Sequence, residues 1–316
     1  MSRIAFTFSP EKIIFVFVVY FLPANFLFSY EGNLSTPIAV SHEGHFLSPE
    51  YSPDGSMIAY SGAKYRGIHI YDIKTGKNFK LTDGWGDGYG FSFSSDGENI
   101  TFLSREGKLK KIKKVNIKTK KSDEIYSSAK KTGLPFWHKD DSISFTIEGE
   151  LQYRDSRGNF RKGRKGVKGH SIAFFQDSPV ILEEDHIKIN NNRFSVDGRY
   201  YSIKVSETGG ILLMHLIENG HIYVLNLING KITDIGKGYA GNFSPDGKWV
   251  IANISEDDGH KIISSELWLL KSDGKKRIQI TNTDDRMEMY PAFSPDGKEI
   301  VFSELNTGKI FRCKIK

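Results

Sequence analysis

Apolar and polar residues alternate in short runs along most of the chain, and glycine-containing turns separate these runs. Residues 293–302 show the pattern: Phe293, Ile300 and Phe302 are apolar and β-prone, and Pro295-Asp296-Gly297 lies between them. Proline fixes φ at the first corner of a turn, aspartate can accept a hydrogen bond from the backbone two residues on, and glycine supplies a positive φ. The pattern therefore predicts two antiparallel strands joined by a tight turn.

This strand–turn–strand unit recurs. Turns of the same type occur at residues 51–55, 93–97, 194–198 and 243–247, and residues 137–141 are a degenerate copy without the glycine. The aligned aspartates are 42 to 57 residues apart, and the units contain four short strand-like runs, a to d. Repeats of about 40 to 50 residues with four strands are typical of propeller blades. The sequence therefore predicts an all-β propeller of four-stranded antiparallel blades.

The two ends of the predicted propeller complement each other. After Pro291 the last unit supplies only strands a, b and c, whereas residues 36–40, upstream of the first turn, match a strand d. We expect this N-terminal strand to complete the last blade and close the ring, because the pairing removes an open sheet edge.

The number of blades depends on the longest interval, between Asp140 and Asp197. It contains three short strand-like runs, at residues 171–175, 179–182 and 186–189. These runs form either an inserted hairpin, which leaves six blades, or a degenerate blade, which makes seven. Six blades is the preferred prediction, and seven is the alternative.

The repeats resemble those of the TolB-like six-bladed β-propellers. The resemblance rests on the pattern Pro-Ala-Phe-Ser-Pro-Asp-Gly-Lys-x-Ile-x-Phe, which residues 291–302 carry, and it covers roughly residues 34–316. It implies a scaffold that docks partners on its loop face and at the mouth of its channel. The α/β domain that precedes the propeller in TolB is not expected in this chain, because too few residues separate Tyr30 from Pro49.

Residues 1–30 form a separate segment. Arg3 and Lys12 precede an apolar run at residues 13–22, and a second apolar stretch follows at residues 26–28. Positive residues before an apolar run of this length are typical of a secretory signal, and a retained membrane anchor is the alternative. Either interpretation places the propeller domain, residues 31–316, outside the cytoplasm, in the periplasm or secreted.

The net charge of +6 is unevenly distributed. Residues 105–168 contain 19 Lys and Arg against 8 Asp and Glu, which leaves the rest of the chain at −5. Two clusters on outer strands of neighbouring blades form a predicted basic flank, whose members are Lys110, Lys111, Lys113, Lys114, Arg161, Lys162, Arg164 and Lys165. The flank is interpreted either as a solvated strand face that discourages edge pairing or as a contact surface for an anionic lipid or glycan. Nucleic acid is not an expected partner of an exported protein without a recognition motif.

No catalytic motif is evident in the sequence. It lacks a Gly-x-Ser-x-Gly nucleophile elbow, and its one cysteine, Cys313, is predicted to pack between blades. His42 and His45 lie in a loop, and the Gly-rich residues 83–90 lack the spacing of an EF-hand, so neither a metal site nor a cofactor is predicted. The repeated turn aspartates are predicted to cap their turns through local hydrogen bonds instead of acting as catalytic carboxylates.

The irregular d–a and b–c loops are predicted to share one face of the ring, opposite the short a–b and c–d turns. Loops on a rigid scaffold commonly carry binding residues, and aromatic and arginine side chains are frequent anchors of interfaces. The candidate binding-face residues are His42, His45, Tyr65, Arg66, Trp85, Tyr89, Arg105, Asp257, His260, Arg286, Glu288 and Tyr290.

These observations predict an exported, non-enzymatic propeller that binds a protein or another ligand at the cell envelope through this face. The alternative is a polysaccharide lyase or hydrolase with a histidine and carboxylate site at the channel mouth. Candidates for such a site are His42, His260 and Glu288. An enzyme would need its acid and base to converge on one substrate atom.

Overall fold

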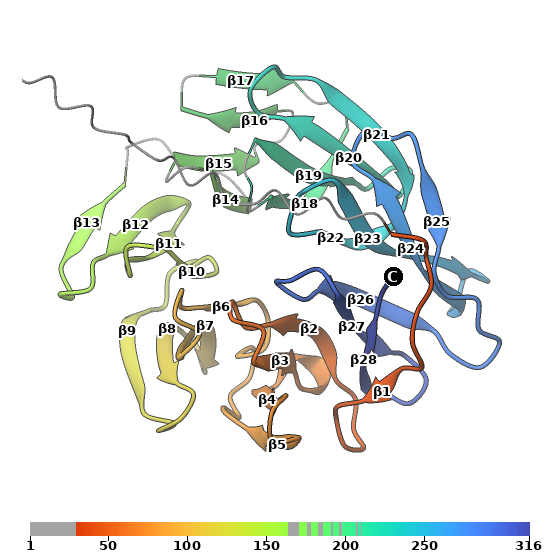
Figure 1. Cartoon of the computed structure of the whole chain (residues 1–316). Helices are drawn as coiled ribbons and strands as arrows, with labels where there is room; N and C mark the ends of the chain where they lie inside the picture. The colour runs from red at the N-terminus through yellow and green to blue at the C-terminus, as the bar shows by residue number, and fades with distance from the viewer. Residues whose placement is uncertain are drawn as a thin grey trace, which may run out of the picture.

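The computed structural model describes residues 30–163, 171–175, 178–182, 186–190, 192–195, 198–206, 208 and 210–316. Within these residues, seven four-stranded antiparallel sheets follow one another along the chain. Figure 1 shows these sheets as blades that succeed one another around a common centre. The predicted all-β propeller is therefore confirmed.

Each blade contains four strands, a to d. Blade 1 consists of β2 (Leu47–Tyr51), β3 (Met57–Ser61), β4 (Ile68–Asp72) and β5 (Lys77–Lys80), with the short 3-10 helix η1 (Ala63–Tyr65) between β3 and β4. Blade 2 consists of β6 (Phe91–Phe93), β7 (Asn99–Glu106), β8 (Leu109–Asn116) and β9 (Ser122–Ser128). Blade 3 consists of β10 (Phe136–Trp137), β11 (Ile143–Ile147), β12 (Glu150–Arg154) and β13 (Phe160–Lys162). Blade 4 consists of β14 (Ser171–Phe175), β15 (Ser178–Leu182), β16 (His186–Ile189) and β17 (Asn192–Ser195).

Blade 5 consists of β18 (Tyr200–Val205), β19 (Ile211–Leu216), β20 (His221–Asn226) and β21 (Ile232–Lys237). Blade 6 consists of β22 (Tyr239–Phe243), β23 (Trp249–Asp257), β24 (Ile262–Lys271) and β25 (Arg277–Gln279). Blade 7 consists of β26 (Glu288–Phe293), β27 (Glu299–Glu304), β28 (Ile310–Lys314) and the N-terminal β1 (Ile38–Ala39).

The N-terminal strand closes the ring as predicted. In the antiparallel ladder between β1 and β28, Ile38 pairs with Arg312 and Ala39 with Phe311. The N–H of Val40 continues this ladder by donating to the carbonyl of Ile310 at 2.8 Å. Blade 7 is thus built from both ends of the described chain, so that opening the ring would break hydrogen bonds inside a sheet.

The preferred number of six blades is wrong, and the alternative of seven is correct. The three runs in the long interval are strands of blade 4, and β17 completes that blade. The turn motif at residues 194–198 was misplaced, because Phe194 lies in the outer strand β17, where it pairs with Ile187. The a–b turn of blade 5 lies downstream, where the N–H of Ser206 bonds to the carbonyl of Ile211 at 3.1 Å.

The turn of blade 5 was missed because it lacks the aspartate of the repeat. Ser206 Oγ instead hydrogen-bonds to Thr208 Oγ1 at 2.8 Å. The backbone closure is nevertheless that of a regular copy, in which the N–H of Ser244 donates to the carbonyl of Trp249 at 2.8 Å. A threonine hydroxyl therefore replaces the aspartate carboxylate in this copy.

The regular turns confirm the predicted role of the aspartates. Asp246 Oδ1 accepts hydrogen bonds from Ser244 Oγ at 2.6 Å and from the N–H of Lys248 at 3.1 Å. Asp96 forms the equivalent pair of bonds, and these bonds, from the Ser94 hydroxyl and the Glu98 N–H, lower its pKa. The carboxylates are used to hold the turns.

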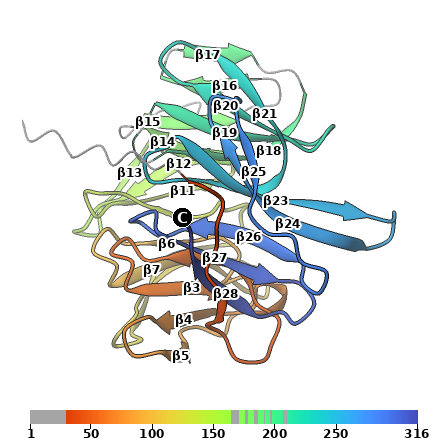
Figure 2. The ribbon, with the colours of Figure 1, turned by 45° about the vertical axis from the view of Figure 1, so that its right-hand side comes forward.

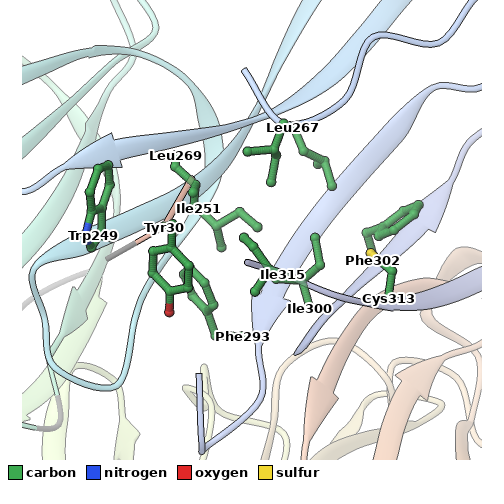
Figure 3. Close-up of a cluster of buried hydrophobic side chains, with 11 residues drawn as sticks. Tyr30, Trp249, Ile251, Leu267, Leu269, Phe293, Ile300, Phe302, Cys313 and Ile315 are labelled. Atoms are coloured by element: carbon green, nitrogen blue, oxygen red, sulfur yellow. The ribbon is translucent and has the colours of Figure 1, made fainter. Parts of the chain in front are cut away.

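The hydrophobic core is divided into clusters that lie at the junctions between consecutive blades. Figure 3 shows the cluster between blades 6 and 7, which contains Leu267 and Leu269 of β24 together with Phe302 and Cys313 of blade 7. Cys313 is 3% exposed, so its predicted packing between blades is confirmed. Each blade is therefore stabilised mainly by burying its faces against its two neighbours.

No helix among residues 30–316, apart from the gaps in the described ranges, combines the length and apolar character needed to cross a bilayer. The predicted signal or anchor lies almost entirely in residues 1–29, outside the described residues.

Candidate functional site

The antiparallel blades define two faces of the ring. The loop face carries the d–a and b–c connections, and the turn face carries the a–b and c–d turns. The irregular segments, such as residues 62–67 between β3 and β4 and residues 81–90 between β5 and β6, belong to the loop face.

Five of the predicted binding-face residues come together on the loop face. We call Tyr65, Arg66, Trp85, Tyr89 and Tyr290 the aromatic cluster. The Arg66 guanidinium lies 5.4 Å from the centroid of the Trp85 ring, and the rings of Tyr65 and Tyr89 meet edge to face at 5.0 Å. Burial, followed by the neighbouring Tyr290 and Tyr89, raises the pKa of Tyr65. Blades 1 and 7 and the connection to blade 2 therefore contribute to one surface.

Aromatic surface in this cluster is accessible. Trp85 is 56% exposed and Tyr89 is 50% exposed. Large exposed aromatic side chains beside an arginine resemble the anchors of protein interfaces, in which rigid rings lose little conformational entropy on binding.

Contacts with the backbone hold the loop that carries Trp85. Arg66 Nε donates to the carbonyl of Asp83 at 3.2 Å, and the N–H of Arg105 donates to the carbonyl of Trp85 at 3.1 Å. Beneath the loop, Asp87 is 3% exposed and accepts a hydrogen bond from the N–H of Gly84 at 2.9 Å. The predicted candidate Arg105 thus supports the aromatic cluster through its backbone.

Two members of the cluster have a left-handed backbone. The φ angle is 59° at Tyr65 and 53° at Tyr290, a region that is costly for a bulky side chain. At Tyr290 the N–H bonds to the Asn253 side-chain oxygen at 3.3 Å, next to a register shift between Met289 and Ala292. The contact with Asn253 of blade 6 therefore helps to hold the backbone at Tyr290.

Glu288 lies beneath the loop face. Its side chain is buried, and it accepts hydrogen bonds from Thr283 Oγ1 at 3.1 Å and Thr281 Oγ1 at 3.4 Å. Arg286 Nε lies 3.7 Å from Glu288 Oε1. Burial, and then the nearby Glu266 carboxylate, raises the pKa of Glu288. Glu288 therefore fixes the connection between β25 and β26 from below, whereas the Arg286 side chain is 29% exposed.

The remaining candidates lie on separate connections. His42 and His45 are exposed between β1 and β2, and Asp257 and His260 are exposed at the end of the β23–β24 hairpin. Figure 2 shows that this hairpin projects beyond the ring. The three groups considered for acid–base chemistry, His42, His260 and Glu288, are thus not brought together among the described residues. The described part of the chain also contains no group of three or more His, Cys, Asp or Glu side chains suited to a metal ion.

The sequence interpretation missed a polar arrangement on the innermost strands. Lys204 Nζ on β18 donates to Asn242 Oδ1 on β22 at 2.6 Å, and Asn242 Nδ2 donates to the carbonyl of Pro291 on β26 at 2.7 Å. Burial lowers the pKa of Lys204, and the Glu50 carboxylate on β2 opposes this shift. Glu50, Lys204 and Asn242 each precede the first serine of an a–b turn by two residues. That spacing could have revealed them if the turn at Ser206 had been recognised.

The basic flank is largely neutralised on blade 2. Lys111 pairs with Glu106 at 2.7 Å and with Glu124 at 3.0 Å, and Lys113 also pairs with Glu106. Lys114 lies 3.7 Å from Asp123. These cross-strand pairs favour the interpretation of β8 as a solvated strand face.

The other members of the flank are distributed over several environments. Lys110 is partly exposed on β8, and Arg161 and Lys162 are exposed on β13. The Arg161 guanidinium stacks 4.8 Å from the Tyr153 ring centroid. Arg164 and Lys165 lie outside the described residues.

A cleft of about 580 Å³ lies on the turn face at the junction of blades 7 and 1. Its polar groups bond largely to one another: Arg312 pairs with Glu299 at 3.3 Å, and the Tyr51 hydroxyl donates to Glu299 at 3.4 Å. Because these groups already bond to one another, they are less available to bind a ligand in the cleft.

Comparisons with known proteins agree with this fold. No protein-family model matches the chain. It is 25% identical over 278 residues to the Tol-Pal system protein TolB of Francisella tularensis subsp. holarctica, covering 84% of this chain and 58% of that protein. It is 23% identical over 338 residues to dipeptidyl-peptidase 5 of Porphyromonas gingivalis, covering 84% of this chain and 47% of that protein. The chain thus spans about half the length of the curated relatives it matches.

Among solved structures, the β-propeller domain of Cps50 (Swd1) from Myceliophteria thermophila has a TM-score of 0.65 at 12% identity. The match covers 90% of this chain and 99% of that domain, and it supports the propeller fold alone. The predicted resemblance is confirmed as a similarity: the chain is similar to TolB in sequence, and it folds as a β-propeller with seven blades in place of the six expected.

Proposed function

We propose that this chain is an exported, non-enzymatic propeller that binds a protein partner at the cell envelope. The partner docks on the aromatic cluster of the loop face. The observation that carries this proposal is the exposure of Trp85 and Tyr89 on a loop whose backbone is already fixed. A fixed loop loses little entropy on binding, so that more of the contact energy appears as affinity.

The cluster has the composition of an interface anchor. Arginine and large aromatic residues dominate the energetics of many protein interfaces, particularly where a ring of polar contacts excludes water from them. Arg66 can contribute its planar stacking on Trp85, while its guanidinium also pairs with Asp83 at 3.4 Å. The partly exposed Arg286 and the exposed Arg105 extend the same face with further cationic groups.

The similarity to the Tol-Pal system protein TolB supports a binding role, because the name of that relative places it in a system of several proteins. Export is supported by the positive residues and apolar run of residues 1–30. The separation of His42, His260 and Glu288 favours binding over acid–base catalysis, which requires such groups within hydrogen-bond reach of one substrate atom.

The test is capture of a partner by crosslinking in native membranes, with the full chain as bait. Replacement of Trp85 by alanine should weaken partner binding by roughly 30-fold, as expected for truncation of an aromatic hot spot. Phe160→Ala is the matched control, because Phe160 is 53% exposed but lies on the outer strand β13. Both variants should melt close to the parent temperature.

A partner captured by the parent and by Phe160→Ala, but lost by Trp85→Ala, supports the proposal. Equal retention of that partner by the two variants would show that it docks elsewhere.

A further inference from the structure

The c–d turns carry exposed positive charge around the outer rim of the turn face. These turns span residues 73–76, 117–121, 155–159, 227–231 and 272–276 in blades 1, 2, 3, 5 and 6. They contain eight basic residues, all exposed, and two acidic residues, Asp155 and Asp273. We call the eight the basic rim: Lys74, Lys118, Lys120, Lys121, Arg157, Lys231, Lys275 and Lys276.

The charges of the basic rim are available to a partner. None of its members forms an ion pair with another described residue, whereas three of the four flank lysines on β8 do. Its internal contacts are weak: the Lys120 ammonium lies 4.9 Å from the Phe79 ring and the Lys276 ammonium 6.0 Å from the Trp249 ring. The basic rim is therefore a positive surface whose charges are not used in ion pairs among the described residues.

The two acidic residues of these turns are already used locally. Asp155 Oδ1 accepts the N–H of Asn159 at 2.8 Å, and Asp273 Oδ1 accepts the N–H of Lys275 at 3.0 Å. The aspartates of the a–b turns lie on the same face, but at the ends of the inner strands, and they cap their turns. The positive charge consequently belongs to the circumference of the face.

A second, independent observation concerns Tyr30, which is 5% exposed. Its ring stacks on Phe293 at 5.5 Å, and its hydroxyl donates to the carbonyl of Gly297 at 3.0 Å (Figure 3). Gly297 belongs to the a–b turn of blade 7, so Tyr30 is fixed on the turn face. The N–H groups of Glu31 and Gly32 also bond to the carbonyl of Lys316, at 2.8 and 3.0 Å. The first described residues, Tyr30 to Gly32, are therefore held on the same face as the basic rim.

We propose that the turn face docks on an anionic phospholipid bilayer through the basic rim, with the loop face directed away from the membrane. Basic residues distributed over five blades cannot converge on one small ligand, but a flat anionic surface can contact many of them together. Each lysine close to such a surface adds a similar increment of binding, and these increments fall steeply with rising salt.

This orientation leaves the aromatic cluster accessible to a partner in solution, but it does not depend on that partner. A flat surface that contacts the rim engages the turn face, whereas Trp85 and Tyr89 lie on the opposite side of the ring. Membrane docking and partner binding can therefore be tested by separate variants.

The test measures partition of the full chain onto vesicles of phosphatidylcholine and phosphatidylglycerol in equal parts. The rim variant combines Lys118→Gln, Lys121→Gln, Lys231→Gln and Lys275→Gln. The matched control combines Lys64→Gln, Lys108→Gln, Lys131→Gln and Lys261→Gln, which removes the same charge from exposed lysines of the loop face. The rim variant should partition roughly 100-fold more weakly than the parent, and the control within about threefold of it.

Hydrogen exchange on the same vesicles provides a second readout that does not depend on the strength of attachment. Protection of residues 117–121 and 272–276, without protection of residues 62–67, supports the proposed orientation. Equal loss of partition by the two variants, protection of the loop face, or equal partition onto vesicles of phosphatidylcholine alone would each overturn it. A rim-dependent interaction seen only with an acidic polysaccharide would also overturn the assignment to lipid.

Discussion

Two junctions between neighbouring blades differ in how many buried hydrophobic residues they contain. The junction between blades 6 and 7 contains eleven buried hydrophobic residues, including Trp249, Leu267 and Phe302. Among the described residues, the core cluster at the junction between blades 3 and 4 contains two, Leu151 and Ile181. The first junction lies next to the blade that closes the ring, and the second lies across the ring from it.

The smaller junction replaces aliphatic packing with aromatic contacts on the inner strands. Phe174 of β14 lies 4.4 Å from the His138 ring and 4.9 Å from the Phe136 ring. Phe136 remains 39% exposed, so this ring is removed from water less completely than Phe302. Because the stability of a repeat array depends on the contacts between neighbouring repeats, the difference predicts unequal resistance to local opening.

The largest effect is expected at the larger junction. Phe302 is 0% exposed, and replacing it with alanine leaves a cavity between blades 6 and 7. Phe302→Ala should lower the free energy of unfolding by about 4 kcal/mol, as in other buried phenylalanine truncations. Urea unfolding followed by tryptophan fluorescence measures this change. A loss below about 1 kcal/mol would mean that the junction collapses to fill the cavity.

A smaller loss of stability, confined to the neighbouring blades, is expected at the junction between blades 3 and 4. Leu151 is 3% exposed, and Leu151→Ala should cost about 2 kcal/mol, near the lower end for leucine truncation, because few described apolar residues surround it. Hydrogen exchange should accelerate in β15 and β16 while the amides of β24 and β27 keep their rates. Uniform acceleration across all blades would show that the junctions do not open independently.

The comparison also explains which parts of the fold were predictable. The blades with a complete Ser-Pro-Asp-Gly turn were recognised, because proline, aspartate and glycine each perform a fixed task there. Blade 4 was only an alternative, since its strands are short and it lacks that turn. The turn of blade 5 was missed because Thr208 replaces the aspartate, and the motif at Phe194 displaced the repeat by one strand.

The candidate site was predictable only in part. Loop position and residue type were sufficient to select Tyr65, Arg66, Trp85 and Tyr89, which the structure brings together. Residue type could not reveal that Glu288 is buried, because its burial depends on how Thr281 and Thr283 fold over it. The contact of Lys204 with Asn242 joins two blades, and register along one strand does not specify such a contact.

At a third junction, a buried hydrogen bond joins the two neighbouring blades. His215 of blade 5 accepts a hydrogen bond from the N–H of Gly241 at 3.1 Å, at the junction with blade 6. Burial, followed by the nearby Lys204 ammonium, lowers the pKa of His215 to about 3. The unfolded chain binds a proton at this histidine near its ordinary pKa of about 6.5. The stabilisation is therefore fully present above that pH and is lost progressively as the pH falls toward 3.

His215 should consequently lower the free energy of unfolding by about 1.2 kcal/mol between pH 6 and pH 5. The measurement compares urea unfolding of the parent and of His215→Gln at several pH values, since carboxylates elsewhere add the same background to both. The variant should show a shallower dependence on pH. Parallel curves would mean that the folded protein accommodates the protonated imidazole.

The smallest effects on stability are expected at the a–b turns of the blades. Asp246 in blade 6 accepts hydrogen bonds from the hydroxyl of Ser244, two residues before it, and from the N–H of Lys248, two residues after it. Asp140, in the degenerate copy of blade 3, accepts both of its bonds from Ser142, at 2.6 Å from the hydroxyl and 3.0 Å from the N–H. The two turns thus use different residues to make the same number of bonds.

Replacing either aspartate with alanine should therefore cost about 1 kcal/mol, the usual value for lost side-chain to backbone bonds. Thermal and urea unfolding of Asp246→Ala and Asp140→Ala, beside the parent, measure both losses. Similar losses would mean that the two turns stabilise their blades equally. The difference in stability between the two junctions would then come from the packing between blades. A negligible loss for Asp140→Ala, together with a loss of about 1 kcal/mol for Asp246→Ala, would instead indicate that the a–b turn of blade 3 contributes less stability than that of blade 6.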